Sequence, residues 1–213
     1  MSDFLTLLPR LWEGAQITLQ IFVVVLVLSI PLGIIVAFLM QIKFKPLEWF
    51  LHLYIWIIRG TPLLLQLIFF FFVLPKIGIT LDRIPSAILA FTVNYAAYFA
   101  EIFRGGIASI PKGQYEAAKV LKFKPLQTIR YIILPQVTKI VLPSVFNEVI
   151  TLVKDTSLVH VVGITELFRV SQTASNRQVS LMPMFYAGAI YLLMVGIATL
   201  LSRQAEKHFS YYK

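Results

Sequence analysis

Five runs of apolar residues, each long enough to cross a bilayer, decide what this chain can fold into. They cover residues 17–40, 47–74, 84–103, 137–159 and 181–201. A helix rises about 1.5 Å per residue, so a hydrocarbon core of about 30 Å needs about 20 apolar residues. Charged residues make up only 14% of the chain, against about 25% in soluble domains. We predict an all-α, polytopic membrane protein with five transmembrane helices, in which residues 1–213 form a single membrane domain. The composition excludes an ordinary soluble enzyme.

The lysines and arginines are distributed unevenly between the two sides that these spans would create. One set of connections carries twelve of them: Lys43, Lys45, Arg104, Lys112, Lys119, Lys122, Lys124, Arg130, Lys139, Arg203, Lys207 and Lys213. The other set carries six: Arg10, Lys76, Arg83, Lys154, Arg169 and Arg177. Because positive residues concentrate on cytoplasmic loops, we predict an outside N-terminus and a cytoplasmic C-terminus in the cell membrane. This rule also explains the net charge of +9, so no nucleic-acid partner is predicted.

Residues 104–136 form the largest predicted cytoplasmic feature, and they are too polar and too few to cross the membrane. Ser109 is expected to cap the first of two short helices. One face of that helix carries Tyr115, Ala118 and Leu121. Pro125 is expected to open the second helix, and Pro135 to close it. Such an elbow suits a docking surface better than a linker.

This elbow carries a family resemblance. Its sequence EAA at residues 116–118, followed by IILP at residues 132–135, resembles the EAA loop of ABC-importer permeases. In that family the loop sits in a groove of a cytoplasmic ATPase subunit. The resemblance implies roles in ATPase coupling for Tyr115, Glu116, Ala117, Ala118, Leu121, Lys122 and Pro135.

Lys122 stands where the family pattern has a glycine. If that glycine ends the first elbow helix in a left-handed conformation, a lysine there costs about 1 kcal/mol or more. A cation at a helix C-terminus interacts favourably with the helix dipole, which stabilises the helix by about 0.3 to 1 kcal/mol. The loop is therefore expected to form. What Lys122 puts in question is the geometry of the turn and hence the fit to the ATPase.

Two further segments resemble signatures of the polar amino acid branch of these permeases. They are RGTPL at residues 59–63, with Gln66 beyond it, and KDTSL at residues 154–158. The resemblance runs from about Gly14 to the last helix. It implies a type I importer permease fold and assembly with a second permease chain, identical or homologous. It also implies two copies of an ATPase subunit and an extracellular or periplasmic amino-acid-binding protein.

Several polar residues fall inside the predicted spans. Polar groups in the bilayer cost free energy, so such residues usually face a bundle interior or a water-filled path. By helical rise, Arg59, Asn94 and Glu148 lie near mid-membrane at similar depth. Arg59 is suited to a substrate carboxylate, and Glu148 to its ammonium group. The predicted substrate pathway comprises Arg59, Thr61, Gln66, Asn94, Asn147, Glu148, Asp155, Thr156 and Ser157. The alternative is that Arg59 and Glu148 pair with each other, or cap exposed backbone at the break between Gly60 and Pro62, and never touch substrate.

The sequence lacks a phosphate-binding loop of the form GxxxxGK[ST], so the chain is not expected to hydrolyse ATP by that mechanism. We predict a transporter subunit rather than an enzyme, with ATP and magnesium held by a partner ATPase. The chain has no cysteine and no HExxH motif, so no metal site or cofactor of its own is predicted. The alternative hypothesis is an ion-coupled secondary amino acid carrier. By resemblance the substrate is a polar amino acid, with a lean to cystine ahead of glutamine or basic amino acids.

Overall fold

The computed structural model describes residues 2–209, and their side chains from residue 5 onward; the described part is helical throughout, without strands. Its α-helices are α1 (Ser2–Leu39), α2 (Lys45–Gly60), α3 (Leu63–Ile68), α4 (Arg83–Ala108), α5 (Lys112–Val120), α6 (Pro125–Thr128), α7 (Leu134–Asp155), α8 (Leu167–Gln178) and α9 (Met182–His208). Two π-helical turns, Phe69–Val73 and Ile129–Ile133, and two 3₁₀ segments, Leu74–Ile77 and Thr156–Val162, continue α3, α6 and α7. The all-α fold is therefore as predicted.

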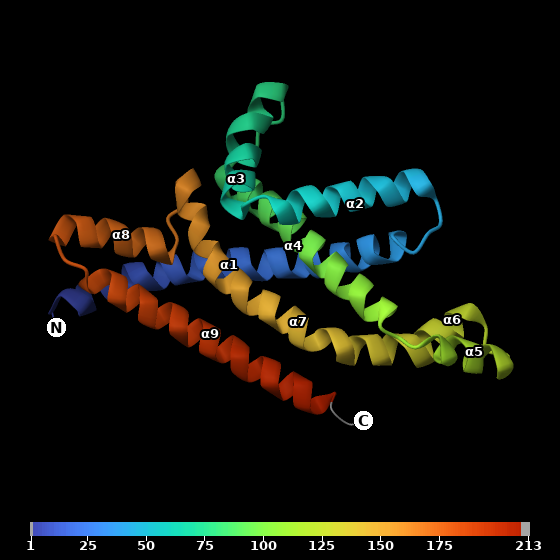
Figure 1. Cartoon of the computed structure of the whole chain (residues 1–213). Helices are drawn as coiled ribbons and strands as arrows, with labels where there is room; N and C mark the ends of the chain where they lie inside the picture. Colours follow the sequence, from blue (N-terminus) through green and yellow to red (C-terminus); the bar gives the residue numbers. More distant parts are fainter. Residues whose placement is uncertain (1, 210–213) are drawn as a thin grey trace.

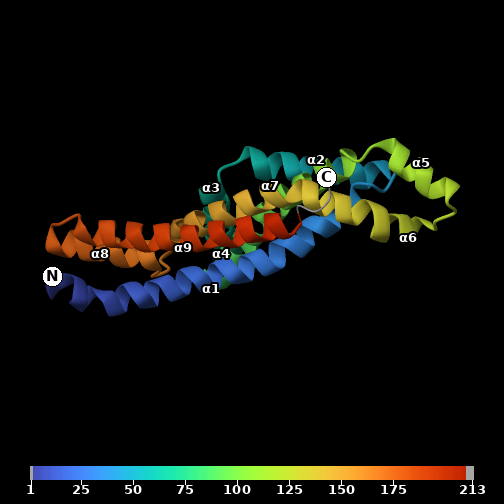
Figure 2. The same cartoon turned by 90° about the horizontal axis from the view of Figure 1, so that it is seen from below.

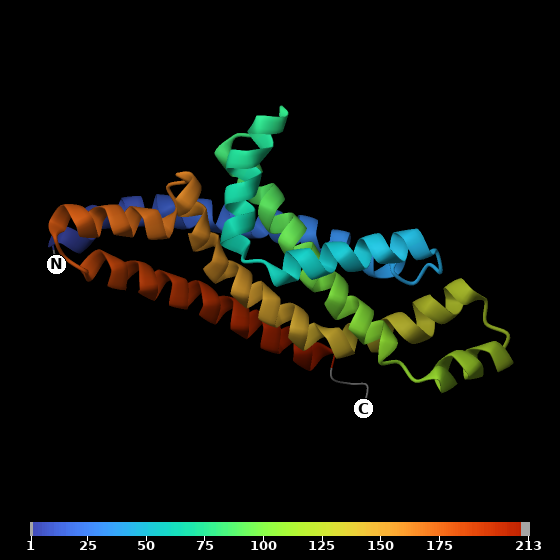
Figure 3. The same ribbon diagram turned by 45° about the horizontal axis from the view of Figure 1, so that its top comes forward.

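Four of these helices are long and apolar enough to cross a membrane, and the bent pair formed by α2 and α3 makes a fifth if it counts as one span. The bend measures 106° and falls at Thr61 and Pro62. Proline has no N–H for the helix ladder, and it forces the preceding residue into an extended conformation, here φ −119° and ψ 146° at Thr61. As a result, α3 projects away from the other helices (Figures 1 and 3).

The core lies where α4 packs across α1. Phe91, Tyr95 and Phe99 of α4 are fully or almost fully buried and form one cluster with Ile21 of α1. The two helices approach closely at Gly33, where an added Cβ would lie 2.5 Å from the Cβ of Phe99. Glycine at this position allows α4 to sit in the centre of the molecule, between α1 on one side and α2 and α7 on the other (Figure 1).

The elbow differs from the sequence prediction at both residues that were expected to mark helix ends, Ser109 and Pro135. Ser109 does not cap α5: it ends α4, which runs to Ala108, and its hydroxyl donates to the carbonyl of Gly106. Pro135 does not close a helix, because residues 125–162 run on as one helical span. Pro135 lies in the first turn of α7, directly after the π-helical turn Ile129–Ile133. A proline is tolerated in a first turn, where its missing N–H is not needed.

The opposite end of the molecule is built around Glu166, which caps α8. Its carboxylate accepts the backbone N–H groups of Phe168 and Arg169 at 2.6 and 2.7 Å and the hydroxyl of Tyr191 at 2.9 Å. The side chain is completely buried. Burial raises the pKa of this carboxyl and outweighs the three hydrogen bonds, which act in the other direction. Glu166 thereby ties the start of α8 to α9.

Candidate functional site

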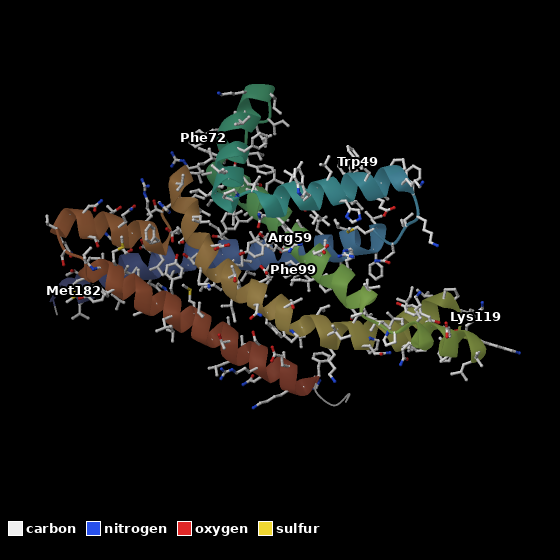
Figure 4. The ribbon with its side chains drawn as sticks, viewed as in Figure 1. Trp49, Arg59, Phe72, Phe99, Lys119 and Met182 are labelled. Atoms are coloured by element: carbon white, nitrogen blue, oxygen red, sulfur yellow. The ribbon has the colours of Figure 1, made fainter. Side chains whose placement is uncertain are left out.

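A cavity of about 460 Å³ lies between α2, α3, α4 and α7, beside the break at Pro62. It is lined by Arg59, Gly60, Thr61, Pro62, Leu63, Asn94, Tyr95, Tyr98, Glu148, Thr151 and Asp155. Five residues of the predicted substrate pathway therefore share one cavity: Arg59, Thr61, Asn94, Glu148 and Asp155. Figure 4 shows Arg59 at the centre of the molecule, where α2 meets α4.

The break itself is held by Gln66, a buried residue of α3. Pro62 cannot donate to the carbonyl of Ile58, and the side-chain Nε2 of Gln66 donates to that carbonyl instead, at 2.8 Å. The same nitrogen donates to the Thr61 hydroxyl oxygen at 2.8 Å. Asn94 Nδ2 in turn donates to Gln66 Oε1 at 3.0 Å. Gln66 is thus a positioning residue that satisfies the broken helix, and it links α3 to α4.

Arg59 is the cation of the cavity. It lies in the last turn of α2, is exposed, and stacks over the ring of Tyr98 with its Cζ 5.2 Å from the ring centroid. Arg104 and Glu101 form an ion pair, with a nitrogen–oxygen distance of 2.5 Å. No other ion pair with a distance within 4 Å is present among the described residues. Arg59 and Glu148 therefore do not pair in this structure, and the guanidinium keeps its hydrogen-bond donors for another group.

Two carboxylates face the same cavity from α7. Glu148 and Asp155 lie on one side of that helix, because their spacing is close to two helical turns. Asp155 accepts a hydrogen bond from the hydroxyl of Tyr95 at 2.8 Å, which holds it in place. Glu148 is half-buried. The lining thus presents one guanidinium and two carboxylates, an arrangement that suits a ligand with both a carboxylate and cationic nitrogen.

Four predicted pathway residues do not line this cavity: Gln66, which holds the break, and Asn147, Thr156 and Ser157. Asn147 is exposed on another side of α7. The hydroxyls of Thr156 and Ser157 donate to the backbone carbonyls of Val153 and Lys154, at 2.7 and 2.8 Å. Such local bonds are the common use of these residues in helices.

The sequence reasoning also missed cavity residues that the structure supplies. Tyr95 and Tyr98 of α4 and Thr151 of α7 all line it. Tyr98 comes one helical turn after Asn94, and Thr151 comes three residues after Glu148. Projecting the helical face of each predicted polar residue would have found them.

The predicted coupling residues lie far from this cavity, at the elbow end of the molecule (Figures 1 and 4). Ala118 is buried, while Glu116, Ala117 and Leu121 are exposed. Helix α5 ends in a hydrogen-bonded turn in which Lys122 N–H donates to the Lys119 carbonyl and the next N–H to Ala118, both at 3.0 Å. This is the helix ending that requires a left-handed residue, and Lys122 has φ 58°.

The sequence matches a known family over residues 29–210, described as the binding-protein-dependent transport system inner membrane component. The chain belongs to this family. It is a multi-pass permease subunit of the membrane, not an enzyme, and ATP hydrolysis belongs to a separate subunit.

Two curated relatives in Bacillus subtilis (strain 168) cover nearly the whole chain. The L-cystine transport system permease protein TcyB is 35% identical over 96% of this chain and 88% of its own length. The arginine transport system permease protein ArtQ is 37% identical over 94% of this chain and 92% of its own length.

Solved structures agree with the fold. An amino acid ABC transporter crystallised with histidines matches at a TM-score of 0.89 and 29% identity, covering 97% of both chains. The MetNI methionine ABC transporter in an inward-facing conformation matches at a TM-score of 0.77 and 20% identity, covering 98% of this chain and 99% of that one. The type I ABC importer permease fold predicted from the sequence is confirmed.

Proposed function

We propose that this permease passes an amino acid across the membrane through the cavity at Arg59, within an importer driven by ATP. The observation that carries the proposal is the presence of one guanidinium and two carboxylates in one cavity without an ion pair between Arg59 and Glu148. An amino acid stripped of water needs an opposite charge, or several hydrogen bonds, at each end. Arg59 receives the carboxylate with its planar fork, and Glu148 receives the ammonium.

The second carboxylate narrows the substrate class. Asp155 adds a negative charge that a simple zwitterion does not balance. A basic amino acid carries a further cationic group, and cystine carries a second ammonium together with a second carboxylate, whereas glutamine and glutamate carry no further cation. The relatives whose names specify cystine and arginine transport support the same two classes. We retain cystine as the first candidate and a basic amino acid as the second.

The proposed complex contains a second permease chain, two copies of a cytoplasmic ATPase that bind ATP and magnesium, and an external amino-acid-binding protein. Closure of the ATPases on ATP moves the elbow. Residues 125–162 form one helical span, so α6, the second helix of the elbow, and the two carboxylates of α7 belong to the same continuous helix. Its movement therefore reaches the cavity directly, which is the physical basis for alternating access to the two sides.

The outer end of the chain has a surface suited to the binding protein. A cavity of about 520 Å³ between α1 and α8 is lined by Arg10 and Arg177 together with Thr6, Thr165 and Thr173. Two guanidinium groups make this patch basic, so we propose that it meets acidic residues on the binding protein.

Reconstituted uptake tests the substrate assignment. The chain, its ATPase and the binding protein are placed in proteoliposomes with ATP inside or outside and labelled cystine, arginine, glutamine or glutamate. Arg59→Ala and Glu148→Gln each remove a charged hydrogen-bond partner, so we expect transport efficiency to fall about 10- to 100-fold. Lys45→Gln is the matched control, because it removes a cation from the same helix outside the cavity.

Normal transport by both cavity variants would refute the assignment of the substrate to this cavity. Uptake that follows an imposed proton or sodium gradient, without ATP, would replace the importer with an ion-coupled secondary carrier. The choice between cystine and a basic amino acid follows from which labelled substrate stimulates ATP hydrolysis.

A further inference from the structure

A second cavity, unlike the first, is almost wholly apolar. It has a volume of about 460 Å³ and lies between α1, α4, α7 and the elbow. Neither α2 nor α3 contributes to it, and no charged residue lines it. The amino acid pathway therefore does not explain it. All three long helices that wall it are long and apolar enough to span a membrane.

The groove is polar at one end only. Gln41 at the end of α1, Tyr115 of α5 and Thr138 in the second turn of α7 are its polar lining residues, and all three lie toward the elbow. The deep end, toward mid-membrane, is formed by Ile34 and Val145 among other apolar side chains. The groove thus changes from polar to apolar along α7, as a phospholipid does from its headgroup to its acyl chains.

The dimensions suit one acyl chain. The lining on α7 runs from Leu134 to Val145, which is roughly 16 Å at about 1.5 Å per residue.

Charge near the polar end selects the headgroup. Lys43, two residues beyond Gln41, and Arg130, next to the lining residue Ile129, are both exposed. The cytoplasmic leaflet has a negative surface potential, and each nearby Lys or Arg strengthens the attraction to anionic lipid. Glu116, beside Tyr115, is the opposing charge on the elbow.

We propose that this groove binds an anionic phospholipid of the cytoplasmic leaflet, with one acyl chain inside it and the phosphate near Lys43 and Arg130. The bound chain contacts Tyr115 of α5 and Ile133 in front of α7, so the lipid packs against the coupling elbow itself. The proposal rests on the membrane location of the chain and on the proposed cytoplasmic side of the elbow, and it does not depend on which amino acid the chain transports.

Native mass spectrometry of the purified permease–ATPase complex tests it, with dioleoylphosphatidylglycerol and dioleoylphosphatidylcholine as the added lipids. Leu142→Trp fills the groove from α7. Ile140→Trp is the matched control, since Ile140 lies on the same helix, is 47% exposed and does not line the groove. We expect the wild type and the control to retain phosphatidylglycerol, and Leu142→Trp to lose at least tenfold in affinity for it. Lys43→Gln with Arg130→Gln should abolish the preference for phosphatidylglycerol.

Equal retention by the two tryptophan variants, or no preference for the anionic lipid in the wild type, would overturn the proposal. A second copy of this chain is the competing occupant. Because the sequence has no cysteine, Leu142→Cys introduces a unique thiol. We expect a bimane label on it to be quenched by phosphatidylglycerol with brominated acyl chains. A disulfide cross-link between copies at this position would instead make the groove a protein interface and overturn lipid binding.

Discussion

Lys122 occupies a backbone conformation, φ 58°, that glycine adopts without cost. We expect Lys122→Gly to stabilise the end of α5 by about 1 kcal/mol, which corresponds to an apparent melting temperature about 2–4 °C higher for a chain of this size. Coupled ATP hydrolysis should be retained or improved, because the turn keeps its two backbone hydrogen bonds. Thermal unfolding and binding-protein-stimulated ATPase activity of the reconstituted complex measure the two effects.

Lys119→Gly provides the opposite control. Lys119 lies in the last turn of α5, where glycine costs about 0.5–1 kcal/mol in a helix. A large loss of coupled ATP hydrolysis in Lys122→Gly, with its melting temperature unchanged or lower, would show that the lysine side chain is needed for docking.

At the level of single residues, the sequence indicated the mid-membrane charges but not the hydrogen bonds that hold the helix break at Pro62. Pro62 predicts a kink from its own chemistry. That Gln66 satisfies the freed carbonyl of Ile58 depends on how α3 turns after the break, which no local pattern contains. The stacking of Tyr98 on Arg59 likewise requires the position of α4 relative to α2.

Among the elements, the crossing of α1 and α4 depends on Gly33. A Cβ there would lie 2.5 Å from the Cβ of Phe99 and 3.0 Å from the backbone nitrogen of Ala100, so the helices must move apart. We expect Gly33→Ala to destabilise the chain by about 1–3 kcal/mol, as overpacked cores do. Gly188→Ala in α9 is the control, because no atom lies within 4 Å of its added Cβ. Unfolding of the purified complex should show a lower melting temperature only for Gly33→Ala; equal stability of the two variants would contradict the tight crossing.

Element boundaries were the part of the fold that the sequence predicted least well. Local signals placed a cap at Ser109 and a stop at Pro135, yet tertiary packing carries α4 through to Ala108. The π-helical turn before Pro135 lets the helical span run past it. A residue type that favours the end of a helix does not force the helix to end there. The packing of α4 against α7 at Gly106 instead decides where α4 ends.

The whole molecule has two unlike ends. The elbow, α5 and α6, forms one of them, and the N-terminus lies with α8 at the other (Figures 1 and 2). The lysines and arginines of the elbow, including Lys119 and Lys124, belong to the more basic set of connections. For the proposed coupling to a cytoplasmic ATPase, the elbow must face the cytoplasm. For the proposed docking of an external binding protein, the opposite end must face the outside. The orientation of the chain is therefore the prediction on which the proposed transport cycle depends.

Labelling of single cysteines tests that orientation, because the sequence has none of its own. Asn176 of α8 and Arg203 near the end of α9 are both exposed, and they lie toward opposite ends of the molecule. With the N-terminus outside, as the positive-inside rule predicts, a membrane-impermeant maleimide should label Asn176→Cys in intact cells. Arg203→Cys should react only after the membrane is opened. Neither position lines the Arg59 cavity, so uptake should persist and report intact folding. The reverse labelling pattern would place the elbow outside the cell, where no ATPase could reach it, and the proposed coupling would fail with it.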